Sequence, residues 1–470
     1  MAMWRPGVAA VAGLTLLGLV GCGSSEGDAV DPGRTGNPGY SPDTTPTSAL
    51  SEMGCSWVRI FDPVVDGLAF PDTSANYWLA LVPSPGPLGR IRIYGRVPDV
   101  RYFAFNSYDA ATAPYDAIAD YEIAPDAFGP TPFLGPVQVD RHIPVGAQYT
   151  VDVEFAPVPQ ESTLNTLYSA VLASVADVAI PNTQFAPIVY RTYLPVGDTT
   201  GGAGLPEIRL EMADGSSFAV GGGDRCSATV RQIMQATGAS RLVDVLNEVG
   251  QPPLPSQLPA PPGSTNPPTF HVFYGIPAGA QDAGIPVPDE LAEGQNGGFF
   301  STRSSRYAYA YLSRNFGELA IVRARAPRFV DQSGGRDPQL RYWSVCQNEF
   351  FTQHVFACAA DHATVVADDG LFYIVISDGG DRPAAADAAH GFNWLPWGPF
   401  YDADVIYRHM LPAEDFAQAF HRIPRDADPT SIAGDYFPQA TYCEPTEFET
   451  LARTRTPSQV FEACRRSAAP

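Results

Sequence analysis

The chain has 470 residues, of which 45% are hydrophobic, and its formal net charge is −22 at pH 7. A charge this negative repels polyanions, so it disfavours nucleic acid and anionic lipid headgroups as partners. All 29 basic residues are arginine, and the absence of lysine excludes Schiff-base chemistry and a lysine general base.

Residues 1–21 are predicted to be an export signal. Arg5 is the only charged residue in this stretch, and residues 8–20 form an apolar run too short for a stable membrane span. Residues 19–22 read LVGC, which resembles the lipobox of a bacterial lipoprotein. The resemblance implies cleavage before Cys22 and a lipid anchor on its sulfur. Because two or three acyl chains hold a protein firmly on a membrane, we expect a lipid-anchored protein of the cell envelope, in the outer membrane or at the cell surface. An ordinary signal peptide is the alternative.

Residues 22–50 are mostly Gly, Ser, Asp, Thr and Pro, a composition typical of a flexible tether. The rest of the chain is long enough for at least two domains with cores of their own. It holds six cysteines, and an even number in an exported protein predicts three disulfides. Sequence proximity favours Cys346–Cys358 and Cys443–Cys464, which leaves Cys55–Cys226. A structural zinc site is the alternative, but no CxxC or HxxxH spacing supports it, so we predict no metal.

A first β-rich domain is predicted for residues 51–224. Residues 90–94 (RIRIY) and 149–155 (YTVDVEF) alternate polar and apolar side chains, as half-buried strands do. Residues 102–105 (YFAF) are almost wholly apolar, which suits a strand covered on both faces. A helix is also expected in the connection of residues 160–179.

Residues 225–298 are predicted to form a helix and a Pro-rich linker. Ser227 can cap a helix over residues 227–249, where apolar residues recur at helical spacing. Gly238 interrupts this pattern and allows two shorter helices instead. Residues 251–268 are dense in proline and are typical of a linker between domains.

A second β-rich domain is predicted for residues 299–412, followed by a helical tail over residues 413–470. Residues 307–312 (YAYAYL) and 371–376 (LFYIVI) are the clearest strands of the second domain. Helices are expected over residues 414–422, 446–453 and 457–465. Thr456 can cap the last one, with Pro457 at its first position.

The two domains repeat three phrases in the same order. The first phrase is residues 92–98 (RIYGRVP) and 322–327 (VRARAP), and the second is residues 101–106 (RYFAFN) and 341–346 (RYWSVC). The third is residues 189–195 (VYRTYLP) and 406–412 (IYRHMLP). The fold class predicted from this repeat is mainly β, with two related β-sandwich or jelly-roll domains and a few peripheral helices.

Part of the chain resembles a known pair of tandem domains. Residues 369–376, 393–396 (NWLP), 398–400 and 407–412 are similar to the C-terminal signature of the DUF1214 domain, and residues 101–109 are similar to its partner domain, DUF1254. The resemblance implies an exported bacterial protein built from β-sandwich domains, and it implies fold rather than activity. The chain departs from the family at Trp397, where small residues are usual, and in its six cysteines.

The repeated arginines Arg101, Arg341, Arg191 and Arg408 are the first candidates for ligand binding. Each lies beside a tyrosine, and guanidinium groups near aromatic rings suit carboxylate, phosphate or sugar ligands. A structural role is the alternative, in which the arginines pair with repeated carboxylates such as Asp109 and Glu349.

Few other residues indicate chemistry. Trp397 is expected to be exposed in a loop, where it could line a groove. The seven histidines show no helical HExxH spacing, and residues 201–204 (GGAG) lack the lysine and the strand-to-helix context of a phosphate loop.

Three functions remain open, and none implies a cofactor. The first is a binding lipoprotein that takes an envelope glycan, lipid or small exported ligand between its two β domains. The second is a hydrolase with a carboxylate and histidine site in the same place, because β-sandwich enzymes assemble sites from distant strands. The third is a structural partner in an envelope complex.

Overall fold

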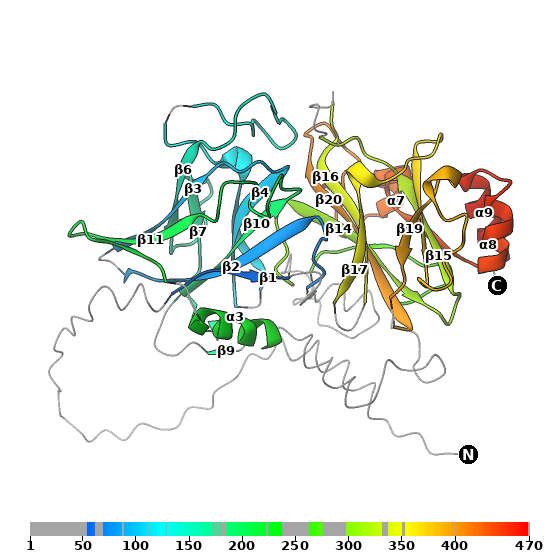
Figure 1. Cartoon of the computed structure of the whole chain (residues 1–470), viewed down its shortest axis with the longest axis horizontal. Coiled ribbons are helices and arrows are strands. Elements are labelled where there is room, and N and C mark those ends of the chain that lie inside the picture. The colour runs from blue at the N-terminus through cyan, green and yellow to red at the C-terminus, as the bar shows by residue number, and fades with distance from the viewer. Residues whose placement is uncertain are drawn as a thin grey trace, which may run out of the picture.

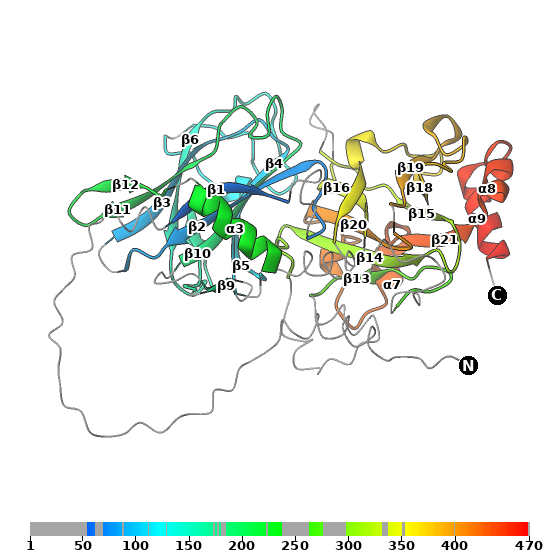
Figure 2. The ribbon, with the colours of Figure 1, turned by 60° about the horizontal axis from the view of Figure 1, so that its bottom comes forward.

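A computed structural model describes residues 54–61, 69–86, 89–110, 112–127, 129–172, 174–175, 178–179, 185–221, 224–236, 263–275, 298–330, 337–349, 353–398 and 400–468. The expected export signal, Cys22 and the tether lie outside the described residues. The described chain folds mainly as β-sheet, in two sandwiches that lie side by side in both views of the ribbon (Figure 1, Figure 2). Of the described helices, none is both long and apolar enough to span a bilayer.

The first sandwich consists of two five-stranded sheets. One has the order β1 (Cys55–Ile60), β2 (Ala75–Pro83), β10 (Phe185–Tyr193), β4 (Tyr102–Tyr108) and β5 (Pro114–Ala119). The other has the order β12 (Ser217–Ala219), β11 (Glu207–Met212), β3 (Gly89–Arg96), β6 (Gln148–Glu154) and β7 (Thr166–Tyr168). A short 3-10 helix, η3 (Asp120–Glu122), follows β5, a hairpin pairs β8 (Ser174–Val175) with β9 (Val178–Ala179), and helix α3 (Asp224–Ala236) packs on β1.

The second sandwich also consists of two sheets. One has the order β13 (His271–Val272), β14 (Ser305–Ser313), β20 (Asp402–Pro412), β16 (Leu340–Asn348) and β17 (Val355–Ala360). The other has the order β19 (Asn393–Pro396), β18 (Leu371–Ser377), β15 (Leu319–Arg325) and β21 (Gln439–Cys443). The helical elements are η4 (Asp361–Ala363), η5 (Ala388–His390), η6 (Phe420–Arg422), α7 (Pro429–Ala433), η7 (Gly434–Tyr436), α8 (Pro445–Ala452) and α9 (Pro457–Ser467).

The two sandwiches share one topology, so the predicted fold class is confirmed. β2, β10, β4 and β5 have the same order in the first sandwich as β14, β20, β16 and β17 in the second. β3 corresponds to β15, and the parallel pair β6–β7 corresponds to the parallel pair β18–β19. Each repeated phrase of the sequence lies on such a pair of strands: the first on β3 and β15, the second on β4 and β16, and the third on β10 and β20.

Strands whose sheet is covered on one face alternate buried and exposed residues, whereas strands whose sheet is covered on both faces are buried throughout. β3 alternates, with Ile91 and Ile93 directed into the core of the first sandwich and the arginines between them directed outward. β4, β10, β16 and most of β20 are buried along their length, because the outer faces of their two sheets pack against each other across the domain junction. Tyr193 and Tyr342 meet there, with ring centroids 5.2 Å apart.

The helices depart from the predictions in three places. Helix α3 begins at Asp224, so Ser227 lies inside it rather than at its cap, and residues 237–249 lie outside the described residues. The segment expected to be helical at residues 160–179 holds β7 instead, which gains a parallel partner in β6. The helix expected at residues 414–422 is reduced to the short η6.

The helical tail is otherwise as predicted. Thr456 caps α9 by accepting from the Gln459 amide, and Pro457 is the first helical residue. Val460 and Phe461 of α9 pack with Phe448 of α8 against the sheet that contains β18.

Candidate functional site

All four predicted arginines contact the opposite sandwich, and Arg101 and Arg341 do so through ion pairs at equivalent positions. Arg101 Nη1 lies 2.5 Å from Asp361 Oδ1 of the second sandwich, and Arg341 Nη1 lies 3.1 Å from Asp120 Oδ2 of the first. The Arg341 side chain is 0% exposed and that of Arg101 is 6% exposed. These ion pairs are therefore buried in the domain junction.

Each aspartate of these pairs also accepts a hydrogen bond from a backbone amide of its own sandwich. The Phe103 amide donates to Asp120 Oδ2 and the Trp343 amide to Asp361 Oδ2, both at 3.1 Å. The same contact thus occurs twice, at equivalent positions, as expected for a repeated domain. The partners expected from the sequence, Asp109 and Glu349, are wrong for these two arginines, because the carboxylates come from the opposite sandwich.

The other two arginines lie at the centre of the junction. Arg408 Nη1 donates to Asp72 and, at 3.0 Å, to Ser344 Oγ. Arg191 Nη2 donates to the Tyr108 hydroxyl and, at 3.1 Å, to the Phe300 carbonyl. All four repeated arginines are therefore buried with protein partners, which is the structural role that the sequence also allowed.

Trp397 is not exposed, contrary to the prediction. It is 1% exposed, its ring lies 5.0 Å from the Arg314 guanidinium, and its carbonyl accepts from Gln347 Nε2 at 2.7 Å. The loop that carries it folds over the end of the second core, so Trp397 packs there and lines no groove.

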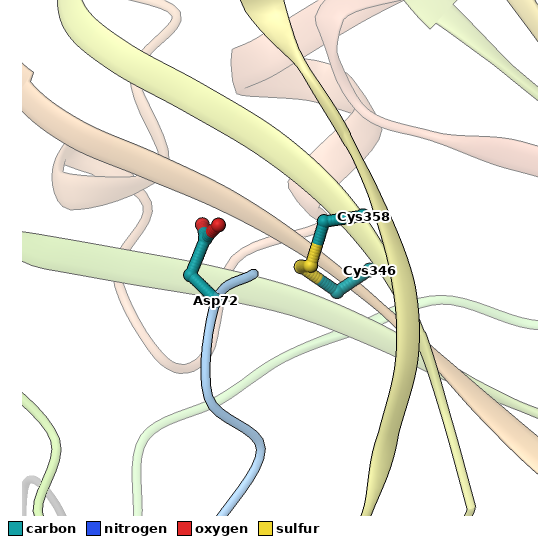
Figure 3. A group of neighbouring side chains, drawn as sticks. All are labelled: Asp72, Cys346 and Cys358. Atoms are coloured by element: carbon teal, nitrogen blue, oxygen red, sulfur yellow. A yellow bond between two sulfur atoms is a disulfide. The ribbon is translucent and has the colours of Figure 1, made fainter. Parts of the chain in front are cut away.

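The three predicted disulfides form, with Cys55–Cys226 joining β1 to α3, Cys443–Cys464 joining β21 to α9, and Cys346–Cys358 linking opposed residues of β16 and β17. The sulfurs of the last pair and the Asp72 carboxylate lie within 4.8 Å of one another (Figure 3). This group offers no metal site as it stands, because the two sulfurs are bonded to each other. Arg408, Ser344 and Tyr342 already donate to Asp72.

A cluster of buried carboxyl groups lies further along the same face of the second sandwich. Asp402 and Asp404 are two residues apart on β20, so both point to the outer face of the sheet. Glu349 follows β16 directly. Their residues are 4%, 3% and 1% exposed, respectively. We call Glu349, Asp402 and Asp404 the acid cluster.

Burial dominates the electrostatics of the acid cluster. It raises the pKa of Asp402 to about 6, with the negative charge of Glu349 adding to the shift and a hydrogen bond from Ser313 opposing it. Burial and Glu349 also raise the pKa of Asp404 well above its usual value. Among the described residues, no cationic group contributes to either shift. Carboxyl groups with strongly shifted pKa values occur more often at functional sites than at ordinary surface positions.

Several acceptors in this region have no donor within the described part of the chain. Asp402 Oδ1, Asp404 Oδ1 and Asn348 Oδ1 are buried there without a hydrogen-bond partner. Asn348 lies directly opposite Asp404 in the pairing of β16 with β20, so the two side chains share one face of the sheet. The Asn348 amide nitrogen donates to the Cys346 carbonyl at 3.1 Å, which leaves its oxygen available.

A row of tyrosines lies beside the acid cluster. Tyr307, Tyr309 and Tyr311 alternate along β14 on the same outer face, and Tyr311 lies opposite Asp404. The rings of Tyr309 and Tyr311 have centroids 5.5 Å apart, and Phe273 packs edge-on against Tyr309 at 6.2 Å. Tyr307 and Tyr311 are partly exposed. We call these three residues the tyrosine row.

The acid cluster lies at the margin of the domain junction. Arg408, at the centre of the junction, and Asp404 lie four residues apart on one face of β20. The turn that carries Glu349 also reaches the first sandwich, since the Phe70 amide donates to the Gln353 carbonyl at 3.0 Å. A ligand at the acid cluster would therefore lie beside both domains.

Sequence reasoning did not find this site. The sequence suggests Glu349 only as a partner for arginine and does not single out Asp402 or Asp404. The available signal was the pair of aspartates in an otherwise apolar strand (DADVIY, residues 402–407), because carboxylates at alternating positions share a sheet face. Two histidines of the second sandwich are deeply buried: burial lowers the pKa of His409, whose ring stacks on Phe420, and that of His421 to about 4.

No family model matches this chain, and no curated protein does either. Among solved structures, an uncharacterised protein of Burkholderia cenocepacia is 13% identical with a TM-score of 0.39, over 74% of this chain and 76% of that one. A lectin of Pleurotus ostreatus is 10% identical with a TM-score of 0.16, over 77% of this chain and 74% of that one. At TM-scores below 0.5, neither likeness supports an argument about fold or function.

Proposed function

We propose that this protein is an exported, lipid-anchored binding protein of the cell envelope that takes a neutral glycan at the margin of its two β domains. The observation that carries the proposal is the acid cluster beside the tyrosine row. Sugar hydroxyls donate hydrogen bonds to carboxylates, and the apolar faces of sugar rings pack on aromatic side chains. A few polar groups on an aromatic wall are typical of small-ligand sites.

Two further features support this choice of ligand. The net charge of −22 disfavours phosphorylated or uronic-acid glycans, which would be repelled. Because the three carboxyl groups are at most 4% exposed, we expect a ligand to stack on the partly exposed tyrosines and to insert a hydroxyl group toward Asp404. The lipid on Cys22 and the DUF1254 and DUF1214 kinship belong to the same proposal and rest on the sequence.

The test is a binding screen with neutral oligosaccharides, followed by titration calorimetry of the strongest binder. We expect Asp404→Asn and Tyr311→Ala each to weaken binding by about tenfold or more, the scale of one lost hydrogen bond or ring contact. Asp415→Asn, an exposed carboxyl-to-amide change outside the site, is the matched control and should leave the affinity unchanged. Equal affinity in all four proteins would place the ligand elsewhere.

A hydrolase is the second candidate, because the pKa of Asp402, at about 6, suits a general acid that works near neutral pH. Release of sugar from aryl glycosides, abolished in Asp402→Asn but not in Asp415→Asn, would favour this function over simple binding.

A further inference from the structure

Asp402 and Asp404 of the acid cluster, and Asn348 beside them, each present one oxygen that receives no hydrogen bond from the described part of the chain. Buried polar atoms in proteins are nearly always hydrogen-bonded, so an unmatched group calls for a partner. Here the unmatched atoms, Asp402 Oδ1, Asp404 Oδ1 and Asn348 Oδ1, are all oxygens. A cation can satisfy several oxygens at once, and its binding would replace the protons that burial otherwise favours on these carboxyl groups.

The strands bring these oxygens to one place. Asn348 and Asp404 are directly opposed on β16 and β20, and Asp402 follows on the same face of β20. Glu349, the residue after Asn348, is close enough for its charge to act on both aspartates. Two carboxyl groups of β20 thus lie near the Asn348 amide of β16 and the Glu349 carboxyl group that follows it, although the two segments are more than 50 positions apart in the sequence.

We propose that the acid cluster and Asn348 form a calcium site. Calcium takes six to eight oxygen ligands in flexible geometry and favours carboxylates and amide carbonyls, whereas zinc prefers the histidine and cysteine ligands that this cluster lacks. Magnesium demands a near-ideal octahedron and keeps several waters, which a deeply buried cluster accommodates poorly. A divalent ion would also neutralise carboxyl groups that otherwise repel one another.

The arrangement indicates a weak site. Among the described residues, the three carboxylates are not gathered as tightly as the Asp72 group, whose ligand atoms all lie within 4.8 Å. Calcium would therefore have to draw the carboxylates together. Because this rearrangement opposes binding, we expect a dissociation constant in the range of extracellular calcium modules, on the order of 0.1–1 mM. The inference does not depend on the proposed glycan binding, since the ion needs only Asn348, Glu349, Asp402 and Asp404.

The test uses the full mature protein, purified with a chelator, and calcium alone. Titration calorimetry should show one calcium ion bound per chain, and calcium should raise the melting temperature by several degrees where magnesium does not. Asp404→Asn should lose most of both effects, whereas Asp415→Asn should retain them. Terbium supplies a second readout, because the tyrosine row should sensitise its emission and calcium should quench that signal by displacement.

Each outcome decides the proposal. Asp404→Asn removes a charge from a group of like charges, so we expect it to fold, and circular dichroism of the calcium-free protein checks this. A wild-type protein that shows neither heat nor stabilisation at millimolar calcium would overturn the proposal, as would stabilisation that persists in Asp404→Asn. Because no sugar is present, failure here leaves the glycan screen intact, and failure of that screen leaves the calcium result intact.

Discussion

Asp402 makes folding sensitive to pH, because its carboxyl group is buried and no cationic group of the described chain acts on it. Burial, reinforced by Glu349, raises the pKa of Asp402 from 3.8 to about 6. Folding therefore favours the protonated form: the group has no effect below pH 4, and it destabilises the fold increasingly as pH rises towards 6. Above that pH the penalty is constant, at about 2–3 kcal/mol once partial solvent screening of the group is included.

We predict that Asp402→Asn is more stable than the wild type by about 2–3 kcal/mol at neutral pH without calcium, because the amide carries no charge to bury. The gain should shrink as pH falls and vanish near pH 4. Urea unfolding of both proteins across this range measures the difference directly, so that other titrating groups cancel. A gain that stays constant with pH would show that it arises from packing rather than from ionisation.

At the same scale, the sequence identified the important arginines but not their partners. Arg101 and Arg341 stand at equivalent strand starts, and that equivalence is visible in the repeated phrases. Their carboxylates are 260 and 221 residues away, on the opposite sandwich, and no local pattern connects them. Trp397 is a second example. Its place in a loop can be predicted from the sequence, but the surface against which that loop packs cannot.

Secondary-structure elements were more predictable than residue contacts where a periodic pattern existed. The strands β3 and β6 alternate because one face of each lies against the core, and this alternation is directly visible in the sequence. The prediction of a helix at residues 414–422 was wrong because a few apolar residues at helical spacing also fit a series of turns that bury Phe416 and Phe420. The acid cluster needed the pairing of β16 with β20, which the sequence does not specify.

The disulfides provide a prediction at the scale of elements. Cys55–Cys226 spans 171 residues and Cys346–Cys358 spans 12. If each acts mainly by restricting the unfolded chain, removing the first should lower the free energy of unfolding by about 5 kcal/mol and removing the second by about 3 kcal/mol. Urea unfolding of the two double alanine variants, each with its other disulfides intact, compares them. The reverse order would mean that packing beside Asp72 outweighs chain entropy.

The whole molecule is held together at a junction that is both charged and apolar. The ion pairs Arg101–Asp361, Arg341–Asp120 and Arg408–Asp72 all cross from one sandwich to the other. Around them lies a continuous apolar cluster with residues from both sandwiches, including Tyr193 and Tyr342. Each sheet at the junction is buried on both faces. Separating the two sandwiches would therefore expose an apolar sheet face on each of them.

We therefore predict that the wild-type protein unfolds in a single calorimetric transition. Arg341→Met leaves the Asp120 carboxylate buried without its cation, and breaking a buried pair in this way should cost about 3–5 kcal/mol. Burial already raises the pKa of Asp120 to about 6 even with Arg341 in place, and without Arg341 the charged form would depend on the backbone amides of Phe103 and Tyr121. The double variant Arg341→Met with Asp120→Leu should recover most of the loss, since an apolar pair of similar volume often replaces a buried ion pair without penalty.

Arg314→Met is the matched control for this prediction. Its partner, Asp378, belongs to the same sandwich, so the substitution tests an ion pair that does not cross the junction. It should lower the stability of the second sandwich while the transition stays single, because the junction is intact. Arg341→Met, by contrast, should broaden or divide the transition as the two sandwiches lose their coupling. Two transitions in the wild type, with positions that Arg341→Met leaves unchanged, would show that the sandwiches fold independently and that the crossed ion pairs contribute little to joining them.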